Sequence, residues 1–107
     1  MRSDRVSFDI DRAEVFGQRM RNESERLKRL ANKLRRASEA TESWWNGDSK
    51  TGFLRRAKEL VSYMNKAGDL VNDMSEDIFT AAARKRDSEK LMNEEVRSTI
   101  NLDQENY

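Results

Sequence analysis

The chain has 107 residues, enough for one small domain, and its 38% charged residues and mean hydropathy of −1.03 exclude a thick globular core. Cysteine and histidine are absent, which excludes disulfides, thiol nucleophiles and the usual zinc ligand sets. Proline is absent and glycine occurs four times, so little interrupts a helix. We therefore expect long helices that each bury one stripe of side chains.

Residues 1–10 are expected to form a flexible arm, and the first helix is expected over residues 11–43. Asp11 is the expected N-cap, and Glu14 stands at the capping-box position. Apolar residues recur every seven positions, which predicts the seam of a helix pair. One row comprises Ala13, Met20, Leu27, Leu34 and Thr41. The other row comprises Phe16, residue 23 or 24, residue 30 or 31, residue 37 or 38, and residue 44 or 45.

The segment Trp44-Trp45-Asn46-Gly47 predicts a tight reversal over residues 44–48. Glycine adopts backbone angles that are closed to other residues, and asparagine tolerates them better than most residues do. Tryptophan offers a large apolar surface that can plug the end of a helical hairpin. Trp45, Asn46 and Gly47 are therefore the expected turn residues. Trp44 is expected to be a second plug or an exposed contact residue.

A second helix is expected over residues 49–92, followed by a flexible tail over 93–107. One of its rows comprises Ala57, Met64, Val71 and Ile78, and the other comprises Leu60, Ala67, Met74 and Ala81. Neighbouring apolar residues widen this stripe beyond the needs of a two-helix hairpin, so we expect further helical partners. The predicted fold is an all-α antiparallel hairpin that dimerises into a four-helix bundle. Its predicted core comprises Phe16, Met20, Leu27, Leu34, Leu60, Met64, Val71, Met74 and Ile78.

The net charge of +1 conceals a strong asymmetry along the predicted hairpin. Residues 26–66 carry eleven Lys or Arg and four Asp or Glu, a net charge of +7, and all other residues together carry −6. An antiparallel dimer would set the loop end of one hairpin beside the open end of the other, so opposite charges would meet. We therefore expect an antiparallel homodimer. The alternative is that these charges form an ordinary solvated helix surface.

With Trp45, Asn46 and Gly47 at the bend, Phe53 eight residues after Trp45, and an Ile10-Asp11 helix entry, the chain resembles the WXG family. These small early-secreted-antigen-like proteins are associated with type VII (ESX) secretion in Gram-positive bacteria and mycobacteria. The resemblance implies a helical hairpin that dimerises antiparallel with itself or with a sister protein. It also implies an exported substrate, adaptor or chaperone-like partner of the secretion ATPase, and not an enzyme.

The family's export signal is usually Tyr-x-x-x-Asp/Glu after the second helix, and neither Tyr63 nor Tyr107 fits it. Leu91 and Glu95, with Leu102 further on, partly meet a looser hydrophobic-x-x-x-acid pattern. The signal is therefore expected to be degenerate, carried by a partner, or missing. No apolar run could span a bilayer or serve as a secretory signal core. We thus expect synthesis in the cytoplasm and secretion by a route that needs no signal peptide.

Two other interpretations stay open. In the first, a nucleic-acid-associated helical protein neutralises phosphates with the basic loop end. Its candidate residues are Arg29, Lys33, Arg36, Arg55 and Lys58. In the second, the chain is a generic coiled-coil scaffold that pairs through the same seams. The type VII interpretation predicts no cofactor, metal, small-molecule substrate or nucleic acid, and no catalytic residues.

Overall fold

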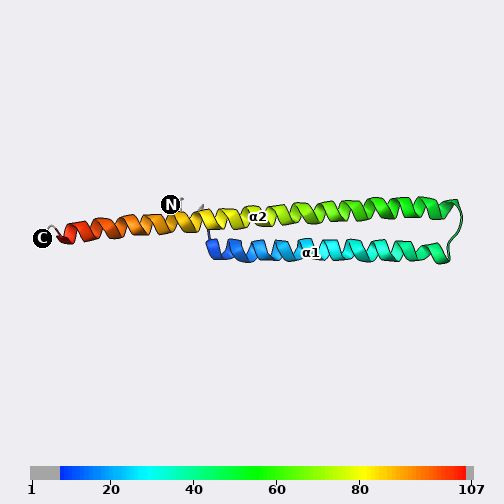
Figure 1. Cartoon of the computed structure of the whole chain (residues 1–107), viewed down its shortest axis with the longest axis horizontal. Helices are drawn as coiled ribbons and strands as arrows, with labels where there is room; N and C mark the ends of the chain where they lie inside the picture. Colours follow the sequence, from blue (N-terminus) through cyan, green and yellow to red (C-terminus); the bar gives the residue numbers. More distant parts are fainter. Residues whose placement is uncertain (1–7, 106–107) are drawn as a thin grey trace.

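The computed structural model describes residues 8–105, and the side chains of residues 8–100. The element order is α1 (Ile10–Ala40), the 3-10 helix η2 (Thr41–Ser43) and α2 (Asp48–Glu105), with no strand among the described residues. α1 and α2 lie antiparallel side by side, and the chain extends 91 Å along its longest axis (Figure 1). The predicted all-helical hairpin is thus confirmed.

The N-cap of α1 lies two residues before the sequence-based N-cap at Asp11. The N-cap is Asp9, whose carboxylate accepts a hydrogen bond from the backbone N–H of Arg12 at 3.0 Å. Both aspartates suit a cap, but the earlier start adds a bond from the Ala13 N–H to the Asp9 carbonyl oxygen at 3.0 Å. Asp11 then lies in the first turn, where the positive end of the helix dipole favours a carboxylate.

The chain reverses direction between η2 and α2, over residues 44–47. The Thr41 carbonyl oxygen accepts hydrogen bonds from the backbone N–H groups of Trp44 and Trp45, at 3.2 and 3.0 Å. Gly47 has a φ of 107°, which is unfavourable for any residue with a side chain. The Gly47 carbonyl oxygen accepts the Lys50 N–H at 3.1 Å and so begins the hydrogen-bond ladder of α2.

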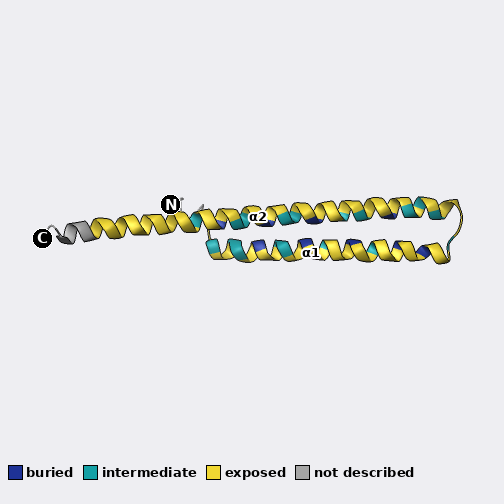
Figure 2. Ribbon diagram, in the orientation of Figure 1, coloured by how far each residue is buried: buried dark blue, intermediate teal, exposed yellow. Residues whose placement is uncertain are grey.

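The two helices meet along a line of side chains that we call the hairpin seam. Its most buried members are small, and they are Gly17, Ser24, Ala31 and Ser38 in α1 and Ala57, Gly68, Ser75 and Ala82 in α2. Larger half-buried side chains complete it, and they are Met20, Leu27, Leu34, Leu54, Val61, Met64, Val71 and Ile78. Figure 2 shows these buried and half-buried residues on the side of each helix that faces the other.

Small residues let the two helices approach until side chain meets backbone. The Ser24 hydroxyl donates a hydrogen bond to the Gly68 carbonyl oxygen at 2.6 Å. A Cβ on Gly68 would lie 3.2 Å from the Ser24 carbonyl oxygen and 3.1 Å from Lys28 Cγ. Gly17 makes similar room for the Phe79 ring, which would lie 3.1–3.3 Å from an added Cβ. Close packing at these positions therefore requires glycine or another very small residue.

In the second row of α1 the sequence left two positions open at each step after Phe16, and the structure places the second of them, Ser24, Ala31 and Ser38, in the seam. Phe16, Leu60 and Met74 were expected in the core of the hairpin or of the dimer; they lie outside the hairpin seam and are 54%, 50% and 47% exposed. The neighbouring Gly17, Val61 and Ser75 take their places in the seam. The short separation of the helices at the Ser24–Gly68 contact favours very small residues in this part of the row, whereas Leu54 and Val61 occupy the same row nearer the bend.

α2 continues to Glu105, beyond the expected end of the second helix at residue 92. No glycine or proline follows Gly68, so nothing in residues 93–105 interrupts a helix. The ion pair between Glu14 and Arg86, at 3.0 Å, lies near the start of α1. Residues 87–105 project past that point, as Figure 1 shows, and we call them the C-terminal extension.

Replacing two glycines of α2 by alanine should have opposite effects on stability. Gly52→Ala should raise the free energy of unfolding by up to about 1 kcal/mol, because nothing lies within 4 Å of its added Cβ and alanine favours a helix. Gly68→Ala should lower it by about 1 kcal/mol or more, because the Ser24 carbonyl must move. Urea denaturation followed by circular dichroism measures both. Equal gains in the two variants would show that the helices are not in close contact at Gly68.

Candidate partner-binding face

The layer formed by the two helices has two broad faces, and one of them is polar. On this polar face, Glu14 pairs with Arg86 at 3.0 Å and Lys28 pairs with Asp69 at 2.6 Å. Both ion pairs cross from one helix to the other, and all four side chains are substantially exposed. Exposed pairs contribute only ~0–1 kcal/mol each. Their main consequence is that this face is charged and well solvated.

The opposite face is apolar, and the residues on it share one property: each stands one position before a seam residue. Two antiparallel helices that share a seam are related by a local twofold axis, so equivalent positions in the two helices lie on the same broad face. The apolar face consists of Phe16, Leu30 and Ala37 on α1, and Phe53, Leu60, Ala67, Met74 and Ala81 on α2. Glu23 interrupts it once.

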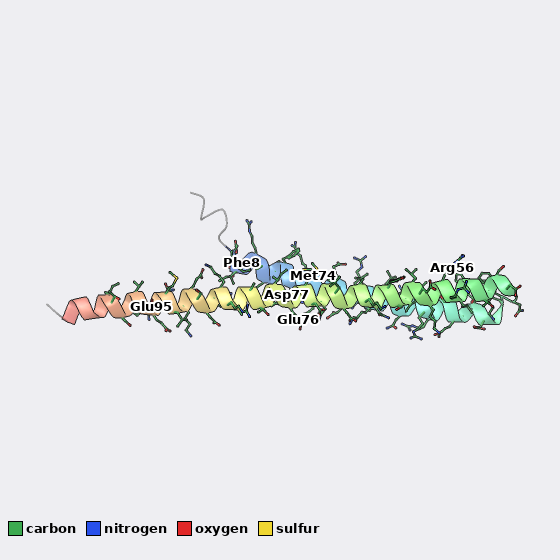
Figure 3. The ribbon with its side chains drawn as sticks, turned by 90° about the horizontal axis from the view of Figure 1, so that it is seen from above. Phe8, Arg56, Met74, Glu76, Asp77 and Glu95 are labelled. Carbon is green, nitrogen blue, oxygen red and sulfur yellow. The ribbon has the colours of Figure 1, made fainter. Side chains whose placement is uncertain are left out.

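The large side chains of this face lie open to solvent within one hairpin. Leu30 is 51% exposed and Phe53 is 37% exposed. Tyr63 and Leu70, 66% and 61% exposed, widen the face along α2. Figure 3 shows Met74 along one edge of α2, opposite the edge that carries Glu76. An apolar surface that runs along a hairpin of this length is typical of a protein-binding site.

The bend holds an aromatic cluster. The rings of Trp44 and Trp45 stack with centroids 6.0 Å apart and planes 10° apart, and the Phe53 ring lies 5.1 Å from that of Trp45. Trp45 is half-buried between these two rings, whereas Trp44 is 70% exposed. The Lys50 ammonium lies 2.7 Å from the Glu42 carboxylate and links the two sides of the bend. Of the two roles considered for Trp44, its exposure favours that of a contact residue.

The candidate export residues lie at the other end of the molecule, far from the bend of the same chain (Figure 1). Leu91 is 61% exposed, and together with the exposed Glu95 it lines a shallow hollow on the C-terminal extension. Val96, which is 58% exposed, also lies on this extension. Leu102 lies outside the residues whose side chains the structure describes.

The basic candidates at the loop end are all exposed. Arg29 lies 4.0 Å from Glu25, whereas no ion pair among the described residues involves Lys33, Arg36, Arg55 or Lys58. Within residues 8–105, no group of three or more acidic side chains is arranged to hold a metal ion. Over the same residues, neither helix combines the length and the apolar character that crossing a membrane demands.

The predicted residues thus divide into two sets. Met20, Leu27, Leu34, Met64, Val71 and Ile78 lie in the hairpin seam, while Phe16, Leu60 and Met74 lie on the apolar face. Apolar character alone does not distinguish the two adjacent rows. The sequence signal that identifies the seam row of α1 is the recurrence of very small residues every seven positions, such as Gly17, Ser24 and Ala31.

Comparison of the chain with protein-family models, with curated proteins and with solved structures gave no match. The geometry of this chain therefore carries the functional argument.

The two tryptophans should contribute unequally to stability. Trp45→Ala removes the stacking with Trp44 and the contact with Phe53, whereas Trp44→Ala removes only the first. Because each aromatic pair contributes ~0.5–1.5 kcal/mol, Trp45→Ala should lower the free energy of unfolding by about 0.5–1.5 kcal/mol more than Trp44→Ala does. Urea denaturation at one protein concentration compares them. A larger loss for Trp44→Ala would contradict this description of the bend.

Proposed function

We propose that this protein is a small non-enzymatic hairpin that binds a second helical hairpin through its apolar face and acts as a substrate or adaptor of type VII (ESX) secretion. The observation that carries the partner-binding part is the solvent exposure of large side chains such as Phe16 and Leu60 along that face. Such a surface favours association with another protein. Two hairpins that pack into a four-helix bundle would bury it.

The bend supports the link to type VII secretion. Trp45, Asn46 and Gly47 lie between two antiparallel helices, and Phe53 contacts Trp45. This matches what the resemblance to the WXG family implies for a Trp-x-Gly turn. The same resemblance implies that the partner is a second copy or a sister protein, and that the secretion ATPase is a further partner.

The C-terminal extension supplies a surface that such an ATPase could read. It projects beyond α1 and exposes Leu91 and Glu95 one helical turn apart. We propose that the protein is made in the cytoplasm and exported without a signal peptide, with this pair as part of the recognised surface.

A matched pair of variants tests the export proposal. Expressed in a Gram-positive host with a type VII system, the protein should reach the culture supernatant, and loss of the secretion ATPase should lower that amount by at least about tenfold. Leu91→Ser should have a similar effect, because it removes the apolar half of the recognised pair. Val96→Ser should export normally, because Val96 is equally exposed but lies outside the pair. A tenfold loss of affinity for the ATPase corresponds to ~1.4 kcal/mol of binding free energy.

A cytosolic marker protein controls for lysis in this experiment. Release that does not depend on the ATPase would contradict the type VII proposal. Equal export of the two serine variants would remove Leu91 from the recognised surface.

The unpaired basic side chains at the loop end favour a second candidate function, binding to nucleic acid. Lys33 and Arg36 on α1 and Arg55 and Lys58 on α2 would contact phosphates without reading sequence. A gel shift at moderate salt tests this function. Tight, salt-sensitive binding of duplexes of unrelated sequence would favour this candidate over type VII export.

A further inference from the structure

The side of α1 that faces away from α2 carries basic side chains along most of its length. Figure 1 shows that α2 lies along one side of α1, so the two helical rows opposite the hairpin seam are open to solvent. Residues three, four or seven positions apart share a side of a helix, which places nine exposed residues in these two rows. Six of the nine are basic and none is acidic. We call these residues the basic strip, and they are Arg12, Val15, Arg19, Asn22, Arg26, Arg29, Lys33, Arg36 and Ala40.

The equivalent rows of α2 have mixed charge. Three of their residues are basic and four are acidic. These rows comprise Arg56, Glu59, Tyr63, Lys66, Leu70, Asp73, Asp77, Thr80, Arg84 and Asp87. An ordinary solvated helix surface mixes charges of both signs in this way. The single sign of the basic strip therefore indicates a ligand of opposite charge and not solvation alone.

Ion pairs within the chain leave most of the charge of the strip available. Arg12, Arg26 and Arg29 each lie 3.6–4.0 Å from a carboxylate three or four residues away, and their side chains are 68–90% exposed. The other three basic residues of the strip take part in no ion pair within the described part of the chain. Exposed pairs contribute only ~0–1 kcal/mol each, so a ligand of high charge can replace them.

We propose that the basic strip binds the phosphate backbone of double-stranded nucleic acid without reading its sequence. This inference goes beyond export and rests on the second candidate function, which it extends from the loop end to the outer side of α1. From Arg12 to Arg36 the strip is about 36 Å long, at ~1.5 Å per residue. One turn of a DNA duplex has a similar length, ~35 Å. A duplex lying along α1 would therefore meet basic side chains over about one full turn.

The composition of the strip favours phosphates over other partners. Protein interfaces are depleted of charged residues at their cores, and helices that bind a membrane surface bury apolar side chains in it. Val15 is the one large apolar residue of the strip, so neither partner fits well. Single strands bind by stacking their bases on aromatic side chains, and the strip has none. A straight row of exposed cations suits the regular backbone of a duplex.

Salt dependence measures how many phosphates are contacted. Fluorescence anisotropy with a labelled DNA duplex of about 20 base pairs should give a Kd of ~1–100 µM at ~150 mM salt, as for other sequence-independent binding. If all six basic side chains contact phosphates, the affinity should fall by about 10³-fold between ~50 and ~200 mM salt.

Two variants of equal net charge test the location of the site. R19Q/R26Q removes two basic residues of the strip that lie away from the bend, and R55Q/K58Q removes two from the loop end of α2. R19Q/R26Q should weaken binding at least about tenfold at ~150 mM salt and lower the slope of log affinity against log salt by about 2. R55Q/K58Q should bind within about threefold of wild type. All four side chains are exposed, so circular dichroism should show an unchanged fold.

Equal losses in the two double variants would overturn the inference, because binding would then follow net charge and not the strip. A larger loss in R55Q/K58Q would also overturn it and would place the second candidate function at the loop end. A wild-type chain that binds no duplex at about 100 µM and ~150 mM salt would overturn both the inference and the second candidate function. The export proposal would still stand on its own test.

Two further probes separate phosphate binding by a duplex from a general attraction to anions. Polyglutamate represents an acidic protein, and vesicles of phosphatidylserine represent an anionic membrane. Both should bind more weakly than the duplex. Tighter binding of either probe would overturn the inference and would identify an acidic protein or an anionic lipid as the ligand of the strip.

Discussion

The contact between Ser24 and Gly68 is the constraint on which the rest of the hairpin depends. A side-chain hydroxyl that donates to a helix carbonyl oxygen 2.6 Å away requires two helices in close contact. In α1 that separation favours the small residues Gly17, Ser24, Ala31 and Ser38 in one row of the seam, and the larger Phe16 and Leu30 lie beside it. The hairpin therefore closes with little apolar area and leaves large apolar side chains such as Phe16 and Leu60 exposed to solvent.

The same constraint explains how the ends of the molecule differ. At the bend, Thr41, Gly47 and the Trp45–Phe53 contact join the helices over a few residues. At the other end α1 begins at Ile10 and α2 continues past it, so that most of the extension projects beyond α1 (Figure 1). One surface thus suits a partner hairpin, and a separate surface suits recognition by another protein. The proposed role as an adaptor or secretion substrate would use both kinds of contact.

The sequence predicts the helical class, the position of the reversal and one row of the seam. Met20, Leu27, Met64 and Val71 lie in the seam, in line with the seven-residue spacing of large apolar residues in the sequence. The residue of the second row that enters the hairpin seam was not predicted in α2, because apolar Leu60 stands beside apolar Val61 and hydrophobicity does not rank them. The separation of the two packed helices decides which of these residues enters the seam, and that separation is not visible in the sequence. The end of α2 was misplaced for a related reason: polar composition does not end a helix without a glycine or proline.

The most direct test of this account measures how fast single introduced cysteines react with an alkylating reagent. Ala31→Cys lies in the seam, where Ala31 is 0% exposed, and Leu30→Cys lies on the apolar face, where Leu30 is 51% exposed. The account predicts that Ala31→Cys is protected at every protein concentration, whereas Leu30→Cys becomes protected only as the concentration rises and dimers form. Protection of Leu30→Cys at all concentrations, with Ala31→Cys reacting freely, would contradict it.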